Sequence, residues 1–329
     1  MLRLMIPMLF CLIGVVLAEA PGRGVLLVAN KGDESLGIVD VDSGQQVATV
    51  PEGGKTGHEV TASPDGRTAY VPIYGDSGVG KPGTDGDRMV VIDIASRKVT
   101  GTVNFGHGVR PHLPVFGPKN GLLYITTELD QAVTIVDPKT LKIVGQIPTG
   151  QTESHMLAIS HDGRRGYTAN VGPGTVSVLD MEARKTLAVI PISGETQRIS
   201  ISPDDKWVFT SDQKAPRLAV IDTAVNKVTA WVPLPGAGYG TAPTPDGKWL
   251  LVDVPSKNQV AIVDLSAMKV VKILDVPKAP QAVLVRPDGK EAYASCDSSH
   301  KIAVIDVASW TVKGTIDAGA GADGLAWAK

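Results

Sequence analysis

Seven positions in the chain carry side chains suited to binding a metal ion or a polar ligand, and their spacing is regular. Six lie seven residues before the central residue of a predicted tight turn, and the seventh holds the equivalent place near the chain end: His58, His112, His155, Gln197, Tyr239, Gln281 and Asp323. Neutral imidazole binds zinc, copper and iron, and three imidazoles leave coordination positions open for water or a substrate. We therefore take the three histidines as candidate metal ligands, for copper or zinc, and the other four as candidate ligand-binding residues.

Two more polar residues lie beside these positions. Arg110 precedes His112 by two residues, and Glu153 precedes His155 by two. We expect both on the same edge of the fold, as further ligand-binding candidates. His107 lies in the same predicted loop as Arg110 and is either a further ligand of the same metal or, as the pattern favours, a solvated loop residue.

The positions belong to a repeat of about 42 residues. A β-branched strand ending in Asp occurs seven times, at intervals of 53, 44, 43, 42, 42 and 42 residues: Asp40, Asp93, Asp137, Asp180, Asp222, Asp264 and Asp306. This regularity, with alternating apolar residues, predicts β-sheet repeats rather than helical ones. Because one such Asp occurs in every copy, we interpret them as turn residues rather than as a carboxylate site.

Each repeat contains four predicted strands, named a to d from the centre outward. In the first full repeat they cover roughly 58–63, 68–73, 88–93 and 98–104. Four-stranded antiparallel sheets arranged radially are the blades of a β-propeller, so the fold class is all-β with seven blades. Strand a is innermost, which places all seven candidate positions around one mouth of the central channel.

The last copy of the repeat ends after its strand a, and its other strands are at the start of the chain. Aligning Asp40 with Asp306 without a gap makes Val25–Asn30 a strand b and Leu36–Asp40 a strand c, which complete the blade begun by Asp323–Ala328. One blade is therefore expected to contain both ends of the chain. This arrangement closes the ring and removes exposed sheet edges.

The long interval marks an insertion at residues 75–87, which is rich in glycine and is expected to overhang His58 and His112. It has neither the spacing of a phosphate-binding P-loop nor a helix after it. It is either a lid over the mouth or an insertion without a binding role.

The repeats resemble the YVTN-type β-propeller family. The resemblance rests on the Val-Ile-Asp strands, on the turn at Pro64-Asp65-Gly66 and its copies, and on Tyr167-Thr168-Ala169-Asn170 and Leu27-Val28-Ala29-Asn30. It covers nearly all of the chain after residue 20 and implies the propeller fold. It does not imply one function, because members include surface-layer, binding and enzyme-associated proteins.

The first 20 residues are predicted to be a secretory signal peptide, and residues 21–329 a single propeller domain. Met1–Ala20 has a basic start at Arg3, an apolar run and small residues suited to cleavage after Ala18 or Ala20. This predicts a periplasmic or secreted protein with no membrane span after cleavage. It also leaves Cys296 as the single cysteine, so no internal disulfide is expected.

A formal charge of −2 gives no basic field for nucleic acid. Two functions from different classes fit the pattern. The first is a ligand-binding or scaffold propeller that binds a small molecule, peptide or protein at the mouth. The alternative is a copper- or zinc-dependent enzyme, such as an oxidoreductase, that uses the three histidines. A lactonase or other hydrolase is the weaker third alternative, and no nucleophile motif supports it.

Overall fold

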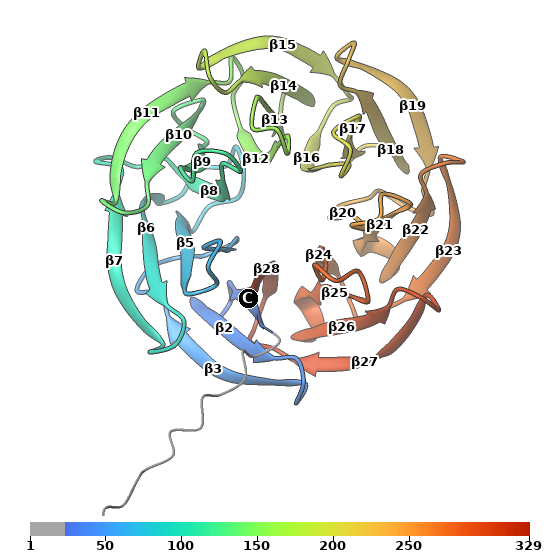
Figure 1. Cartoon of the computed structure of the whole chain (residues 1–329), viewed down its shortest axis with the longest axis horizontal. Helices are drawn as coiled ribbons and strands as arrows, with labels where there is room; N and C mark the ends of the chain where they lie inside the picture. The colour runs from blue at the N-terminus through green and yellow to red at the C-terminus, as the bar shows by residue number, and fades with distance from the viewer. Residues whose placement is uncertain (1–23) are drawn as a thin grey trace, which may run out of the picture.

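Residues 24–329 fold into seven four-stranded antiparallel sheets arranged as blades around a central axis, as the computed structural model shows (Figure 1). The predicted seven-bladed β-propeller is confirmed. The predicted signal peptide, Met1–Ala20, lies outside the residues that the structure describes. Among the described residues, no helix has the length and apolar character needed to cross a membrane.

The first blade, here called the composite blade, pairs the two ends of the chain. Its strands in order from the centre are β28 (Ala322–Ala328), β1 (Val25–Asn30), β2 (Ser35–Asp40) and β3 (Gln45–Pro51). β28 and β1 are antiparallel neighbours, with Leu26 opposite Trp327 and Leu27 opposite Ala326. The predicted closure is therefore confirmed.

The other six blades follow in chain order, each with its strand a innermost. The second has β4 (Thr61–Ala62), β5 (Thr68–Gly75), β6 (Asp85–Asp93) and β7 (Lys98–Asn104); the third has β8 (Pro111–Phe116), β9 (Leu123–Thr127), β10 (Ala132–Asp137) and β11 (Lys142–Pro148). The fourth has β12 (Ser154–Ile159), β13 (Arg165–Asn170), β14 (Thr175–Asp180) and β15 (Lys185–Pro191); the fifth has β16 (Thr196–Ile201), β17 (Trp207–Asp212), β18 (Arg217–Asp222) and β19 (Lys227–Pro233).

The sixth and seventh blades also contain the two short 3₁₀ helices. The sixth has β20 (Thr241–Pro243), β21 (Trp249–Val254), η1 (Pro255–Lys257), β22 (Gln259–Asp264) and β23 (Lys269–Asp275); the seventh has β24 (Pro280–Val285), β25 (Glu291–Cys296), η2 (Asp297–Ser299), β26 (Lys301–Asp306) and β27 (Thr311–Asp317). Each helix fills the connection between strands b and c, on the mouth side of its blade.

The predicted turn role of the seven strand-terminal Asp residues is confirmed. In each, a carboxylate oxygen accepts a backbone N–H from two or three residues further on, as Asp93 does from Ser96 at 2.7 Å and Asp222 does from Ala224 at 2.8 Å. These hydrogen bonds close the turn between strands c and d. The carboxylates are therefore already used within their own blades.

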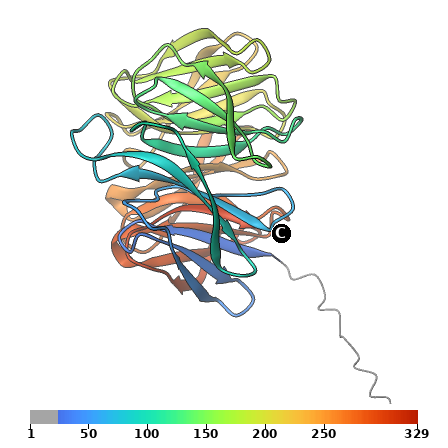
Figure 2. The ribbon, with the colours of Figure 1, turned by 90° about the vertical axis from the view of Figure 1, so that its left-hand side faces the viewer.

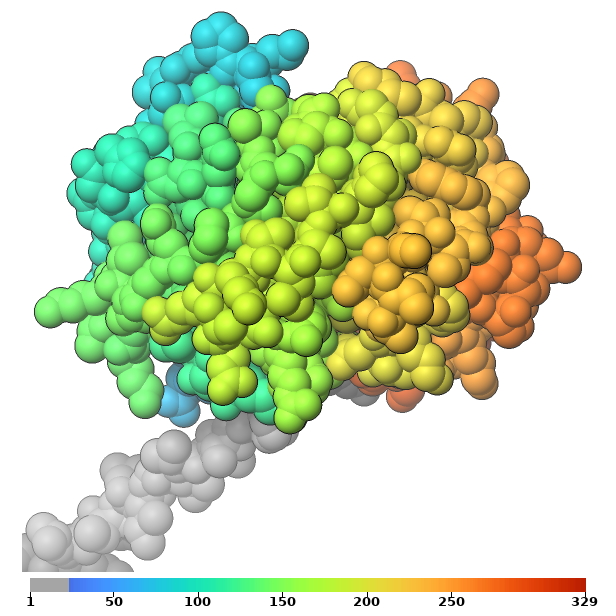
Figure 3. Space-filling view, turned by 90° about the horizontal axis from the view of Figure 1, so that it is seen from above, coloured from blue at the N-terminus to red at the C-terminus, as the bar shows by residue number. Residues whose placement is uncertain are grey.

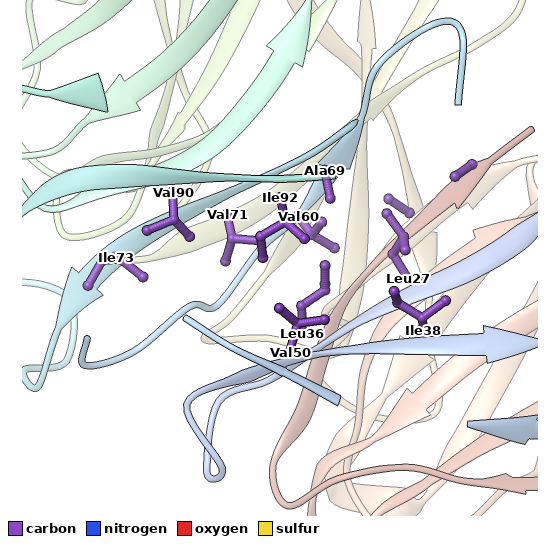
Figure 4. Close-up of a cluster of buried hydrophobic side chains, with 12 residues drawn as sticks. Leu27, Leu36, Ile38, Val50, Val60, Ala69, Val71, Ile73, Val90 and Ile92 are labelled. Atoms are coloured by element: carbon purple, nitrogen blue, oxygen red, sulfur yellow. The ribbon is translucent and has the colours of Figure 1, made fainter. Parts of the chain in front are cut away.

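The hydrophobic core consists of seven separate clusters, each between two neighbouring blades. In the cluster between the composite and second blades, Leu27 and Leu36 face Val60, Val71 and Ile92 (Figure 4). Another cluster joins the composite blade to the seventh, where Leu26 packs with Tyr293 and Ile302. Apolar burial is therefore continuous around the ring, including the junction between the chain ends.

Candidate functional site

Three predicted site residues meet at one mouth of the channel. His112 and His155 lie at the starts of β8 and β12, and His58 lies three residues before β4, so the three come from equivalent repeat positions in consecutive blades, as expected. The ring centroids of His58 and His112 are 5.6 Å apart, and those of His112 and His155 are 3.5 Å apart. His112 and His155 are buried. We call these three residues with Tyr74 and Glu128 the histidine mouth.

The ring geometry does not favour a shared metal ion. The His112 and His155 rings are tilted by 33° relative to each other, with their centroids only 3.5 Å apart. A coordinated ion lies in the plane of each imidazole, about 2 Å from one nitrogen, and two rings whose centroids are this close do not direct their lone pairs to one such point between them. Within residues 24–329, no three His, Cys, Asp or Glu side chains form a group that could hold a metal ion. Copper or zinc at the three histidines therefore gains no support from the structure.

The three imidazoles are in an environment that favours their neutral form. Burial lowers the pKa of His58 to about 4 and lowers the pKa of His112 well below its ordinary value. Burial also lowers the pKa of His155, against the opposing effect of Glu128. His58 Nε2 lies 2.9 Å from the Thr56 hydroxyl, which donates to Gly75 O. His58 therefore carries its proton on Nε2, and its Nδ1 is an acceptor.

Tyr74 of the second blade and Glu128 of the third are hydrogen-bonded to each other beside the histidines. The Tyr74 hydroxyl donates to Glu128 Oε2, and His155 Nδ1 lies 3.7 Å from the same oxygen. Burial would raise the pKa of Glu128, yet the net direction is downward because His155, Tyr74 and a backbone N–H stabilise the carboxylate. Glu128 is thus an ionised carboxylate beneath the surface of the mouth.

Arg110 fixes the insertion over this carboxylate. Its guanidinium donates to Asp85 Oδ1 at 2.6 Å and to Lys81 O at 2.7 Å, both in the insertion, and to Glu128 Oε1 at 3.2 Å. Gly80 N also donates to Glu128 Oε1 at 3.3 Å. The insertion projects from one face of the disc, opposite the face on which the C-terminus lies (Figures 2 and 3).

The insertion is shorter as a loop than expected. β5 continues to Gly75 and β6 begins at Asp85, with these two residues paired, so the loop itself is 76–84. Thr84 N and its hydroxyl both bond to the Asp76 carboxylate. In this structure the 76–84 loop is held against the third blade by its hydrogen bonds with Arg110 and Glu128.

A second polar cluster crosses the channel. Arg198 of the fifth blade donates to Glu59 of the second and, at 2.7 Å, to Asp323 of the composite blade. Lys31 joins Asp323, at 3.2 Å, to Asp297 of the seventh blade, at 2.6 Å. We call these five residues the channel plug. Its charged groups therefore connect four blades from inside the ring.

The pKa values of the two acids that pair with Arg198 in the channel plug are shifted in opposite directions. Burial raises the pKa of Glu59 to about 7, although Arg198 opposes this change. Burial would also raise the pKa of Asp323, but Arg198 and Lys31 together hold it below its ordinary value. Asp323 is thus the ionised partner of Arg198. Tyr239, another predicted site residue, lies with its ring 5.1 Å from the Arg198 guanidinium.

Other predicted residues occupy the expected edge without joining either cluster. Gln197 and Gln281 are half-buried at β16 and β24. The exposed His107 bonds to Asp130 at 2.8 Å instead of approaching the histidines. Cys296 is buried at the end of β25, and burial raises the pKa of its thiol to about 12.

A pocket of about 330 Å³ opens between the insertion and the third and fourth blades. Arg110, Glu128 and Glu153 line it from the blades, and Gly80, Lys81 and Pro82 line it from the insertion. Glu153 Oε2 accepts from Gly172 N at 2.7 Å. The buried Nδ1 atoms of His112 and His155 have no hydrogen-bond partner, and His155 Nδ1 lies 3.7 Å from the Glu128 carboxylate that lines the pocket.

Several residues of the site were not predicted, although a repeat signal exists for them. One repeat position follows strand b immediately in six blades and lies near the end of β5 in the second blade; it holds Lys31, Tyr74, Glu128, Val171, Gln213, Pro255 and Asp297. The position after the one that carries His58 holds Glu59 in the second blade and Arg198 in the fifth. Comparing the repeats at these two positions would have identified the charged and aromatic residues of both clusters.

The comparisons with known proteins agree with the fold. The Cytochrome D1 heme domain family matches residues 117–245, which is less than half of the chain. No curated protein matches. One similar solved structure is Kuenenia stuttgartiensis Hydrazine Synthase, with 20% sequence identity and a TM-score of 0.73, and the match covers 91% of this chain and 99% of that chain. Another is "Dihydro-heme d1 dehydrogenase NirN in complex with DHE", with 16% sequence identity and a TM-score of 0.68, and the match covers 93% of this chain and 75% of that chain.

These likenesses support a propeller related in architecture to the cytochrome d1 type. At these identities the two structures show the fold alone. The specific YVTN assignment remains a prediction, since the matching family is a different propeller family. The matched segment contains Glu128, His155 and Arg198, whereas His58 and His112 lie before it.

The histidine mouth has side chains of a type that coordinates haem iron, but it does not have the space for a haem group. Imidazole is a common axial ligand of haem iron, and the Nδ1 atoms of His112 and His155 have no hydrogen-bond partner. However, both rings are buried against each other, and the pocket beside Glu128 is about 330 Å³ with two carboxylates in its lining. With the insertion in this position, the residues do not form a slot for a macrocycle.

Proposed function

We propose that this protein is a ligand-binding propeller whose site is the pocket beside Glu128 of the histidine mouth. The observation that carries the proposal is a pocket with charged walls, formed by Arg110, Glu128 and Glu153, whose Glu128 carboxylate lies 3.7 Å from the buried His155 Nδ1. That Nδ1 atom has no hydrogen-bond partner within the chain. Buried polar groups in folded proteins nearly always have partners, so a ligand or ordered water beside Glu128 would complete the bonding.

The pocket chemistry defines the class of ligand. Lys81 contributes an ammonium donor from the insertion, and Glu153 contributes a carboxylate acceptor from the opposite wall. A small polar molecule with an acidic group and a donor group, such as an amino or hydroxy acid, complements both walls. The volume, about 330 Å³, is at the small end of ligand pockets.

The experiment is a calorimetric screen of amino acids and hydroxy acids against the full protein, followed by variants of the rim. We expect Lys81→Ala and Glu153→Gln each to weaken binding about tenfold, because each removes a charge-assisted hydrogen bond. His161→Gln, on the opposite face, is the matched control. The proposal would be contradicted if none of the compounds bound, or if both rim variants bound a compound as tightly as the control variant does.

A second candidate function is the binding of a haem-type tetrapyrrole, which the family match over residues 117–245 favours. It requires the 76–84 loop to leave the histidine mouth. Titration with haemin distinguishes the two candidates, because axial coordination by imidazole gives a shifted Soret band. A Soret shift that is lost in both His112→Ala and His155→Ala would favour the tetrapyrrole over the small ligand.

A further inference from the structure

Most of the tryptophans lie in one arc of the face opposite the histidine mouth. The chain has five, and four of them line three inter-blade pockets: Trp207, Trp249, Trp310 and Trp327. The pockets follow one another between the fifth, sixth, seventh and composite blades, at the turns joining strands a to b and c to d. The fifth, Trp231, is on an outer strand, where the Arg217 guanidinium lies 3.8 Å from its ring centroid.

The three pockets are neighbours that share lining residues. The central pocket, between the sixth and seventh blades, has a volume of about 840 Å³. It shares Trp249 with a pocket of about 300 Å³ toward the fifth blade. It shares Asp288 and Lys290 with one of about 400 Å³ toward the composite blade. We call this row of three pockets the tryptophan track.

The central pocket combines aromatic surface with polar groups of both signs. The Trp249 and Trp310 rings meet edge to face, with centroids 5.8 Å apart, and both side chains are half-buried. Around them lie three carboxylates, Asp246, Asp288 and Asp306, each of which already accepts a backbone N–H within its own turn through Oδ1, and the ammonium of Lys290. Indole surfaces that remain partly open beside hydrogen-bonding groups are typical of binding sites rather than of core packing.

We propose that the tryptophan track binds a neutral oligosaccharide. A sugar ring has an apolar C–H face, which packs on indole, and hydroxyl groups, which donate to carboxylates and accept from ammonium groups. Groups of both charge signs line the track, with Asp246, Asp288 and Asp306 beside Lys290 in the central pocket, and the hydroxyl groups of a neutral sugar can hydrogen-bond to both kinds. A polymer of similar units also matches a track that repeats an aromatic side chain from blade to blade.

The backbone at Trp310 allows a clean test. Trp310 has φ of +50°, in the left-handed region that favours glycine, and the equivalent turn of the composite blade has Gly44 at φ +67°. Trp310→Gly therefore removes the indole while relieving backbone strain in the turn. Trp231→Gly would not serve as its control, because β19 is a strand. Trp231→Phe, away from the track, is the better control.

The experiment titrates the full protein with cellohexaose, chitohexaose, maltohexaose and mannohexaose, using calorimetry and intrinsic tryptophan fluorescence. We expect at least one hexaose to bind and to change the fluorescence, because four of the five tryptophans line the track. Trp310→Gly and the exposed Lys290→Ala should weaken binding about tenfold or more, while Trp231→Phe binds as the natural protein does.

Three outcomes would overturn the proposal: no hexaose binds, Trp310→Gly binds with unchanged affinity, or a proline-rich peptide binds the track while sugars do not. Thermal unfolding of each variant checks that the fold is retained. If Trp310→Gly unfolds early, Lys290→Ala alone decides the result, because its side chain is exposed.

Discussion

At the scale of single residues, His58 is the simplest titratable reporter of the histidine mouth. Its folded-state pKa is lowered to about 4 by burial, whereas a histidine in an unfolded chain titrates near 6.5. Between these values the unfolded chain binds the proton more strongly. Stability therefore falls as the pH decreases from about 6.5 to 4, and this loss is absent above about 6.5.

We predict that His58→Gln flattens this dependence. Urea denaturation at several pH values should show a slope lower by up to about 1.4 kcal/mol per pH unit than that of the natural protein, between pH 4 and 6.5. The exposed His161 provides the control, since His161→Gln should leave the slope unchanged. An identical slope in His58→Gln would mean that the imidazole is not held neutral.

Arg198 is the residue whose loss should cost most. Its guanidinium is buried between Glu59 and Asp323, so Arg198→Met leaves a buried carboxylate without its partner. We expect the free energy of unfolding to fall by about 3–5 kcal/mol. The double variant Arg198→Met/Glu59→Gln should recover part of this loss, because it removes one of the unpaired acids. Lys206→Ala, in an exposed ion pair, should change stability by less than about 1 kcal/mol.

At the scale of elements, the 76–84 loop depends on contacts from another blade. Arg110→Ala removes its hydrogen bonds to Asp85 and to the carbonyls of Gly78 and Lys81. We expect hydrogen exchange in 76–84 to increase by about tenfold or more, since each lost contact contributes on the order of 1 kcal/mol. Exchange in β17 should not change. Arg164→Ala, at an exposed turn, is the matched control, and equal protection in both variants would contradict the proposed fastening.

The strands were predictable because the repeat length fixes their register. The alignment of Asp40 with Asp306 predicted Val25–Asn30 as a strand, and β1 has those bounds. Strand a of the second blade was less predictable: residues 58–63 were expected, but β4 is only Thr61–Ala62. There, His58 O accepts from Gly324 N of the composite blade, whereas the preceding Thr56 and Gly57 pair with the end of β5, so the regular pairing of this strand with β5 is interrupted at His58.

The sequence predicted where the candidate residues lie, but not which side chains contact one another. Equivalent repeat positions placed His58, His112 and His155 at one mouth, and the structure brings them together. A repeat alignment predicts where along its strand a residue lies. It does not predict which long side chain extends across the central channel to another blade. The contact between Arg198 and Glu59 joins residues 139 positions apart, and therefore could not be derived from the repeat alone.

At the scale of the whole molecule, ring closure depends on β28. This strand provides the inner edge of the composite blade, and its Ala326 and Ala328 pack in the cluster shared with the second blade. We predict that deleting residues 322–329 prevents formation of a stable monomeric ring, because β1 loses its partner and Arg198 loses Asp323. Size-exclusion chromatography and near-ultraviolet circular dichroism measure this outcome.

The control for that deletion is removal of Lys329 alone, which lies beyond β28 and should leave both measurements unchanged. A folded monomer after deletion of residues 322–329 would show that the other six blades suffice. In that case, the unpaired edge of β1 would have to be tolerated in solution, which is rare for an exposed strand.

The pairing of β1 with β28 also has a consequence for synthesis. β1 leaves the ribosome long before its inner neighbour β28, because all the other strands of the ring lie between them in the sequence. Until β28 has been made, the nascent chain holds an open array with two unfinished edges, and both are available to other proteins. A stop codon before β28 would thus affect the whole ring, and a chaperone that shields β1 until β28 has been made would protect the chain when it is most exposed to aggregation.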